Sequence, residues 1–223
     1  MSGLQTIIDN ATYIEINKQK VAATSISRSG RILTAERVNA IPYRFTVGMH
    51  NGLTFSENRD LLEALDALDT IVESNVDIGA SNSGLNWITS YQGSANTSQV
   101  NQMVMSSTGT ANLVIDTSSV TATGLAGSNI FVIGDVIQPA GNTGTYRYPY
   151  NVTSNVAWNA SSVTVPVHRP VLNQDGVALT SGGVRVGTNC RYHLKPVNKV
   201  FYRAASYNRI EFTDDFDLVE VIQ

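Results

Sequence analysis

The feature that most restricts the fold is an abrupt change in charge density along the chain. Only six charged side chains lie within residues 78–190, a segment of 113 residues, and the other 27 lie in the 110 residues on either side. The closing segment, 191–223, is too short to build a hydrophobic core alone. It therefore has to pack on 1–77, where the charge density is similar. We predict a discontinuous outer domain made of 1–77 and 191–223, with 78–190 inserted as a second domain.

Alternation of apolar and polar residues indicates that the outer domain is mostly β. Period-2 alternation is typical of strands that are buried on one side. The ranges with this pattern are 12–17, 21–27, 31–37, 43–48 and 209–222. Ser29-Gly30 and Asn51-Gly52 supply turn residues between and after these strands. We expect a split β-barrel or sandwich.

Residues 57–72 have the one clear helical pattern, which predicts a single helix packed on the sheet. Four apolar residues share one face, namely Leu61, Leu65, Leu68 and Val72. Thr54 and Glu57 fit a capping box, with Ser56 as a competing N-cap.

The opposite face of this helix is acidic. It contains Asp60, Glu63, Asp66 and Asp69. Two interpretations stay open: a solvated face, or an interface for a basic neighbour.

The inserted segment is a series of short strand patterns separated by turns. These are 85–91, 99–105, 111–116, 119–123, 129–133, 135–138, 148–154 and 161–167. Strands at this spacing without helices predict a small β-barrel or sandwich. Pro149 and Pro166 fall inside such runs, so those strands should be edges or bulged. We expect a loop or hairpin over 170–189, around Asp175-Gly176 and Gly182-Gly183.

No motif in the chain predicts a catalytic, cofactor or metal site. His50, His168 and His193 are far apart and none has metal-ligand spacing. There is no phosphate-binding glycine loop and no nucleophile elbow. A Ser-His-Asp triad is defined by geometry, so the sequence leaves that alternative open. We interpret Asp214-Asp215-Phe216-Asp217 as a turn before the last strand, since the further ligands of a calcium loop are missing.

Charge and hydropathy bear on partners and compartment. The net charge is −3 and there are no basic blocks, so we expect no nucleic-acid partner. No apolar stretch is long enough to span a membrane or to serve as a signal peptide. The single cysteine, Cys190, should be a small buried hydrophobe in a protein made in a reducing cytoplasm.

Aromatic residues gather in the inserted segment and allow two interpretations. Exposed rings on a β surface can stack against sugars, and buried rings would be ordinary core or hairpin-edge residues. The rings that could contact a ligand are Trp87, Tyr91, Tyr148 and Trp158.

The run 27–69 resembles the distal tail (Dit-like) and baseplate hub proteins of tailed bacteriophages. The resemblance is carried by Ser29-Gly30-Arg31, Tyr43-Arg44-Phe45 and the leucines Leu61, Leu62, Leu65 and Leu68. The inserted segment resembles the second β domain of these proteins, an oligonucleotide/oligosaccharide-binding (OB-like) barrel. The stretches that carry this second resemblance are 85–93, 134–141, 149–154 and 163–170.

The resemblance implies a structural subunit of the virion tail, assembled in the cytoplasm of the bacterial host. Such proteins form rings, six-fold in the best-known cases, that join the tail tube to the baseplate or tail tip. The implied partners are copies of the chain and the tube, hub and other baseplate proteins. The alternative is a carbohydrate-binding adhesin that uses the aromatic residues of the insert. A hydrolase comes third, because no pair of acidic residues stands out.

Overall fold

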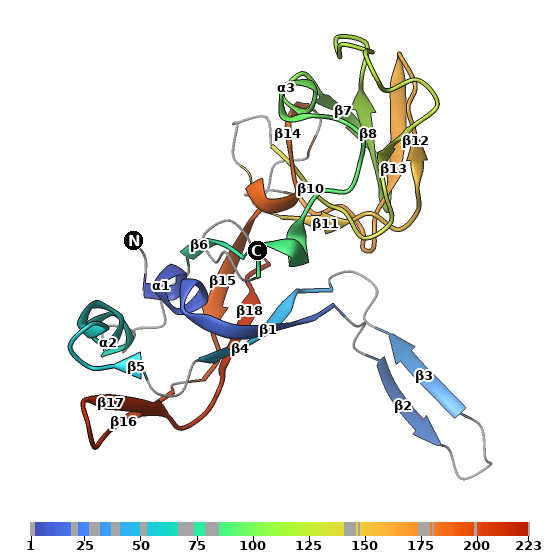
Figure 1. Cartoon of the computed structure of the whole chain (residues 1–223). Helices are drawn as coiled ribbons and strands as arrows, with labels where there is room; N and C mark the ends of the chain where they lie inside the picture. Colours follow the sequence, from blue (N-terminus) through green and yellow to red (C-terminus); the bar gives the residue numbers. More distant parts are fainter. Residues whose placement is uncertain are drawn as a thin grey trace.

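The computed structural model describes residues 3–18, 22–26, 32–36, 41–49, 53–66, 74–78, 85–140, 146, 148–173, 179, 181–198 and 200–222. This part of the chain is mostly β, as predicted, and its strand pairs are antiparallel. Residues 78–190 are called the insert below, and in Figure 1 their described part forms the upper body. The remainder, called the outer part, forms the lower one.

A five-stranded sheet, the outer sheet, organises the outer part in the order β1-β4-β18-β15-β6. Its strands are β1 (Ala11–Asn17), β4 (Arg44–Met49), β18 (Phe216–Glu220), β15 (Arg191–Pro196) and β6 (Ser74–Asp77). Alternation places Phe45 and Val47 in the core while Arg44 is exposed. Asp77 is paired directly with Arg191, so the insert leaves and re-enters the sheet through neighbouring strands.

Two short helices pack together beside the outer sheet, where the sequence predicted one. The helix α1 (Gly3–Asp9) was not predicted; it buries Leu4, Ile7 and Ile8. The Gln5 side chain fixes α1 to β6, because its Nε2 donates to the Asp77 carbonyl at 3.0 Å and its Oε1 accepts from the Asp77 N–H at 2.8 Å.

The predicted helix is present as α2 (Arg59–Asp66), and Leu61 on its apolar face is buried. It begins two residues later than predicted. The Thr54 hydroxyl does contact the Glu57 carboxylate, but the first helical bond runs from the Leu62 N–H to the Asn58 carbonyl. The Leu65 side chain and residues 67–73, with Leu68, Asp69 and Val72, lie outside the described residues.

Two small sheets complete the outer part. One joins β16 (Tyr202–Ala205), β17 (Arg209–Phe212) and β5 (Leu53–Thr54). The other is a hairpin of β2 (Ala22–Ile26) and β3 (Ile32–Glu36), which confirms the two strands predicted there. Figure 1 shows this hairpin extending away from the rest of the molecule. The expected turn residues Ser29-Gly30 and Asn51-Gly52 lie outside the described ranges.

The insert is built on a six-stranded sheet in the order β11-β10-β14-β7-β8-β13. Its strands are β11 (Tyr150–Asn151), β10 (Val136–Pro139), β14 (Gly182–Val186), β7 (Val104–Thr108), β8 (Asn112–Asp116) and β13 (Ser162–Pro166). The two ends of the sheet meet, because Val152 after β11 forms a bridge with Val167 after β13. The fold is therefore barrel-like, with β9 (Asn129–Phe131) and β12 (Val156–Ala157) as a separate pair. Pro166 ends an edge strand, as expected.

Three strand predictions in the insert are wrong. Residues 85–91 contain the 3₁₀ helix η2 (Asn86–Thr89), and 119–123 form turns. Residues 99–105 are divided between α3 (Thr97–Val100) and β7. A reciprocal cap between Asn96 and Gln99 starts α3, so local capping outweighs the β-like pattern of the run that follows. Another 3₁₀ turn, η3 (Gly187–Asn189), follows β14, and Asp175-Gly176 lies outside the described part of the chain.

The buried side chains form two hydrophobic clusters. One is centred on the outer sheet and receives Val136 from the insert, and it contains Cys190 as a small buried residue. The other fills the barrel-like insert, with Ile222 of the outer part packed against it. Independent folding of the insert stays a prediction.

Candidate functional site

Three of the four predicted interface carboxylates are on the exposed side of α2. Asp60, Glu63 and Asp66 are exposed, and Asp66 accepts a hydrogen bond from the Tyr202 hydroxyl at 3.2 Å. The fourth, Asp69, lies outside the described residues. The described part of this face is therefore accessible to a second molecule.

The four aromatic residues of the insert do not form one exposed platform. Trp87 on η2 is 68% exposed, whereas Tyr148 is 0% exposed and offers no ring face to a ligand. Trp158 is partly buried against the cluster that fills the insert. Tyr91 is also partly buried, and its hydroxyl donates to the Ile130 carbonyl.

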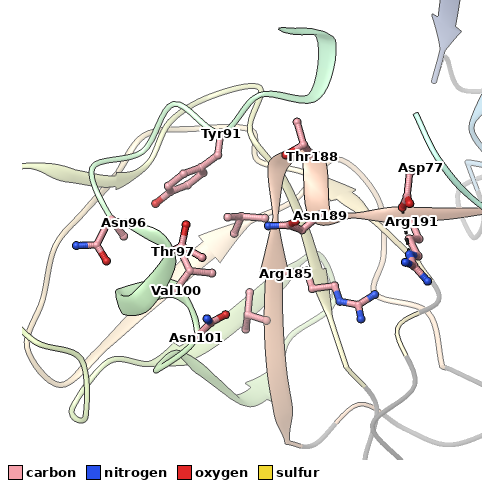
Figure 2. Close-up of a pocket in the computed structure, with 13 residues that line it drawn as sticks. Asp77, Tyr91, Asn96, Thr97, Val100, Asn101, Arg185, Thr188, Asn189 and Arg191 are labelled. Carbon is pink, nitrogen blue, oxygen red and sulfur yellow. Dashed lines mark hydrogen bonds and ion pairs between the residues drawn. The ribbon is translucent and has the colours of Figure 1, made fainter. Parts of the chain in front are cut away.

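Tyr91 lines a pocket, called here the amide pocket, with a volume of about 640 Å³ (Figure 2). The walls come from the start of α3, the end of β14 with η3, and the β6–β15 pair. The polar residues among its lining are Asp77, Tyr91, Asn96, Thr97, Asn101, Arg185, Thr188, Asn189 and Arg191.

Neutral amides and hydroxyls dominate the chemistry of the amide pocket. Asp77 and Arg191 form an ion pair, with Arg191 Nε 3.1 Å from Asp77 Oδ1, so the charges of these two residues cancel. The Arg185 guanidinium lies 3.8 Å from the centre of the Tyr146 ring. Such a pocket suits a polar, uncharged ligand that can exchange hydrogen bonds with amides.

The wall of the amide pocket requires a glycine after β14. Gly187 has φ +60°, and a Cβ there would lie 2.8 Å from the Tyr91 backbone nitrogen. Both constraints exclude an ordinary side chain at this position. Sequence reasoning singled out Tyr91 but missed the surrounding amides, because they come from segments about 90 residues apart.

A buried ion pair joins the insert to the outer part at a second place. Arg169 and Glu220 are in direct contact and both side chains are fully buried. A second bond joins Arg169 Nη2 to Glu220 Oε1 at 2.8 Å. The guanidinium also donates to the Ile41 carbonyl at 2.7 Å and the Pro149 carbonyl at 2.9 Å. One insert side chain therefore satisfies acceptors on both bodies.

Tyr43 and His168 surround this pair. The Tyr43 N–H donates to Glu220 Oε2 at 3.1 Å, and its hydroxyl donates to Asn151 Oδ1. Nδ1 of His168 accepts from the Asn151 N–H at 3.1 Å. Burial, reinforced by the positive charges of Arg169 and Lys18, lowers the pKa of His168 to about 3. This histidine is therefore neutral at physiological pH.

Asp135 has a structural role. Asp135 is buried and accepts the N–H groups of Gln92 and Val132, each at 2.8 Å. Burial raises the pKa of Asp135 despite these bonds. The predicted turn at 214–217 is confirmed only in part, since Asp214 and Asp215 precede β18 but Phe216 and Asp217 are its first two residues. His193 is on β15, and His50 is not among the described residues.

Within the described ranges, no group of three His, Cys, Asp or Glu side chains is close enough together to hold a metal ion. None of the helices described there has the length and apolar character needed to cross a bilayer.

Comparison with known proteins returns no family assignment. No family model matches this chain. A search of curated proteins also found no match. The function is therefore argued from the molecule itself.

Proposed function

We propose that this chain is a structural subunit of a phage tail. In this role, copies of the chain form a ring, most simply of six, that joins the tail tube to the baseplate or tail tip. The outer part makes the ring contacts and the insert projects from it.

The observation that carries the proposal is the β2–β3 hairpin. Among the described strands β2 and β3 pair only with each other, and Figure 1 shows them standing clear of both bodies. An isolated two-stranded hairpin is marginally stable in water. A neighbouring subunit that covers the hairpin supplies the missing packing, and a head-to-tail contact of this kind closes into a ring.

The experiment replaces the hairpin in the assembling phage. Because Asn17 and Arg44 are paired neighbours, a short Gly-Ser link can substitute for residues 20–39. We expect the shortened chain to fold and to be excluded from tails, as measured by its abundance in purified particles. Counting copies by cryo-electron microscopy at the junction of tube and baseplate tests the ring directly.

The matched control is Trp87→Ala, which alters an exposed residue of the insert and should be incorporated normally. Incorporation of the hairpin-deleted chain at wild-type level would contradict the proposal. Location of the wild-type chain on the capsid, or as one copy at a fibre tip, would contradict it too.

A second candidate function is glycan binding, favoured by the amide pocket. Asn96, Asn101 and Asn189 surround this pocket with Tyr91 on one wall. Amides and an aromatic ring are the groups that bind sugar hydroxyls and the apolar face of a sugar ring. Binding on a glycan array that is lost in Asn189→Ala and kept in Trp87→Ala would support this function. If no glycan on the array binds, the glycan-binding function is contradicted and the ring role is the one proposed function that remains.

A further inference from the structure

A smaller cavity, called here the Lys18 cavity, lies where β1 of the outer part meets the insert. Its volume is about 220 Å³. The residues that line it are Ile16, Lys18, Tyr43, Ile88, Thr89, Gly134, Val136, Asn151 and Tyr192. It is separate from the amide pocket, with which it shares no lining residue.

Lys18 brings a positive charge that nothing in the cavity neutralises. Lys18 lines the cavity and remains partly open to solvent. No carboxylate among the described residues forms an ion pair with it. Loss of solvent around Lys18 lowers the pKa of its ammonium group. An anion beside Lys18 would remove that penalty.

Thr89 supplies a second donor that has no partner. The residue is 3% exposed, and its hydroxyl makes no hydrogen bond within the described part of the chain. A buried hydroxyl without a partner is unusual, because it loses its hydrogen bonds to water and gains none in return. Its presence on the wall of a polar cavity indicates a missing acceptor.

Two other polar side chains of the cavity already have partners. The Tyr43 hydroxyl donates to Asn151 Oδ1, and Asn151 Nδ2 donates to the Gly134 carbonyl at 3.1 Å. Lys18 and Thr89 therefore bring to the cavity a cation and a hydroxyl donor that have no partner among the described residues.

We infer that the Lys18 cavity binds a small oxyanion, held by the Lys18 ammonium and the Thr89 hydroxyl. An ammonium with a hydroxyl donor fits the oxygens of a phosphate or a carboxylate. The volume admits a phosphate ion or one acidic side chain of a second copy of the chain. The two sources offer the same chemistry and are separated by experiment.

The first arm titrates inorganic phosphate into the full-length chain at a concentration where it is monomeric. Binding is measured by calorimetry and by the rise in melting temperature, with chloride at equal ionic strength as reference. We expect saturable binding that weakens about tenfold or more in Lys18→Met, since charge-assisted hydrogen bonds are the strongest in proteins. Lys195→Met, a lysine on β15 away from the cavity, should bind phosphate as the wild type does.

Thr89→Val separates ligand binding from folding. Removal of a hydroxyl with no partner should leave the stability of the free chain unchanged or raised, while phosphate binding weakens. A variant that is equally destabilised with and without phosphate would mean that the hydroxyl only supports the fold, which would overturn the inference.

The second arm measures self-association by sedimentation equilibrium. If phosphate does not bind but Lys18→Met and Thr89→Val both weaken association, the oxyanion is a carboxylate of a second copy. If neither phosphate binding nor association responds to the two variants, the inference is wrong. Phosphate binding by the isolated chain does not depend on a role in a phage tail.

Discussion

Arg169 is buried and held by several partners. It is an insert residue whose charge, among the described residues, is paired with that of Glu220 of the outer part, and both are shielded from water. A buried charge deprived of its partner is strongly destabilising, whereas removal of both charges together is much less so.

We therefore expect Arg169→Met to lower the free energy of unfolding by about 3–5 kcal/mol, measured by urea denaturation. The double variant Arg169→Met/Glu220→Met should recover part of this loss. Recovery should be incomplete, because the carbonyls of Ile41 and Pro149 and the Tyr43 N–H then lose their partners. Equal stability of the single and double variants would show that charge burial is not the cause.

His168 should make stability depend on pH. Its pKa falls from 6.5 to about 3 on folding, so below pH 6.5 the unfolded chain takes up a proton that the folded chain does not. Stability should hold above pH 6.5 and decline as the pH falls toward 3. His168→Gln should flatten this decline, as measured by urea unfolding at several pH values. His193→Gln should leave it unchanged; a flattening there as well would point to a different titrating group.

At the scale of single residues, the sequence predicted features that depend on residue type. It did not predict which distant residues pair with each other. The burial of Cys190 followed from its residue type. The Arg169–Glu220 pair did not, because the partners are 51 positions apart and no local pattern relates them. The Lys18 cavity was missed for the same reason.

At the scale of elements, the packing of α2 rests on a narrow apolar face. Leu61 is 2% exposed, so Leu61→Ala should leave a cavity and lower the free energy of unfolding by about 2–5 kcal/mol in chemical denaturation. Glu63→Ala on the same helix should change it by less than about 0.5 kcal/mol. If Leu61→Ala lowered the free energy of unfolding as little as Glu63→Ala does, the apolar face of α2 would not be part of the core.

The acidic side of α2 should act in assembly rather than in folding. Asp60→Lys/Glu63→Lys should leave the urea midpoint nearly unchanged, because both residues are exposed. The same change should reduce the amount of chain in purified tails if a basic neighbour docks there. Asp214→Lys, on the exposed turn before β18, is the control. If the double variant is incorporated into tails normally, the acidic side of α2 faces solvent and does not bind a neighbour.

Strands with regular alternation were predicted well and short irregular elements were not. Alternation identified β4, because its buried Phe45 and Val47 alternate with Arg44 and Thr46, which are more exposed. The helix α1 was missed although Leu4, Ile7 and Ile8 have helical spacing, since seven residues give too short a pattern. η2 resembled a strand because a run of four residues has no distinguishable period.

At the scale of the whole molecule, the division of the chain can be tested by deletion. Since Asp77 and Arg191 are paired neighbours on β6 and β15, a short Gly-Ser link should join the two strands and replace the insert. We expect the closed outer part to keep its β-sheet signal in circular dichroism and to unfold at lower urea concentration than the full chain.

The closed outer part is expected to be less stable than the full chain because it contains Glu220 without Arg169. Without Arg169 its carboxylate has no buried cation, so Glu220→Gln in the shortened chain should raise the urea midpoint. In the full chain the same substitution should lower it. An outer part that stays unfolded with either residue at position 220 would mean that the two bodies fold only together.

The adjacency of Asp77 and Arg191 also affects how this molecule can evolve. Both ends of the insert meet at one pair of neighbouring strand residues, so a longer, shorter or unrelated insert can be accepted there without shifting the register of the outer sheet. Such an exchange has one chemical condition. Any replacement would have to deliver a cation to Glu220, or arrive together with a mutation that removes the acid. Among natural relatives, the residue at position 220 should therefore vary together with the type of insert. It should not follow the sequence of the outer sheet, although it belongs to that sheet.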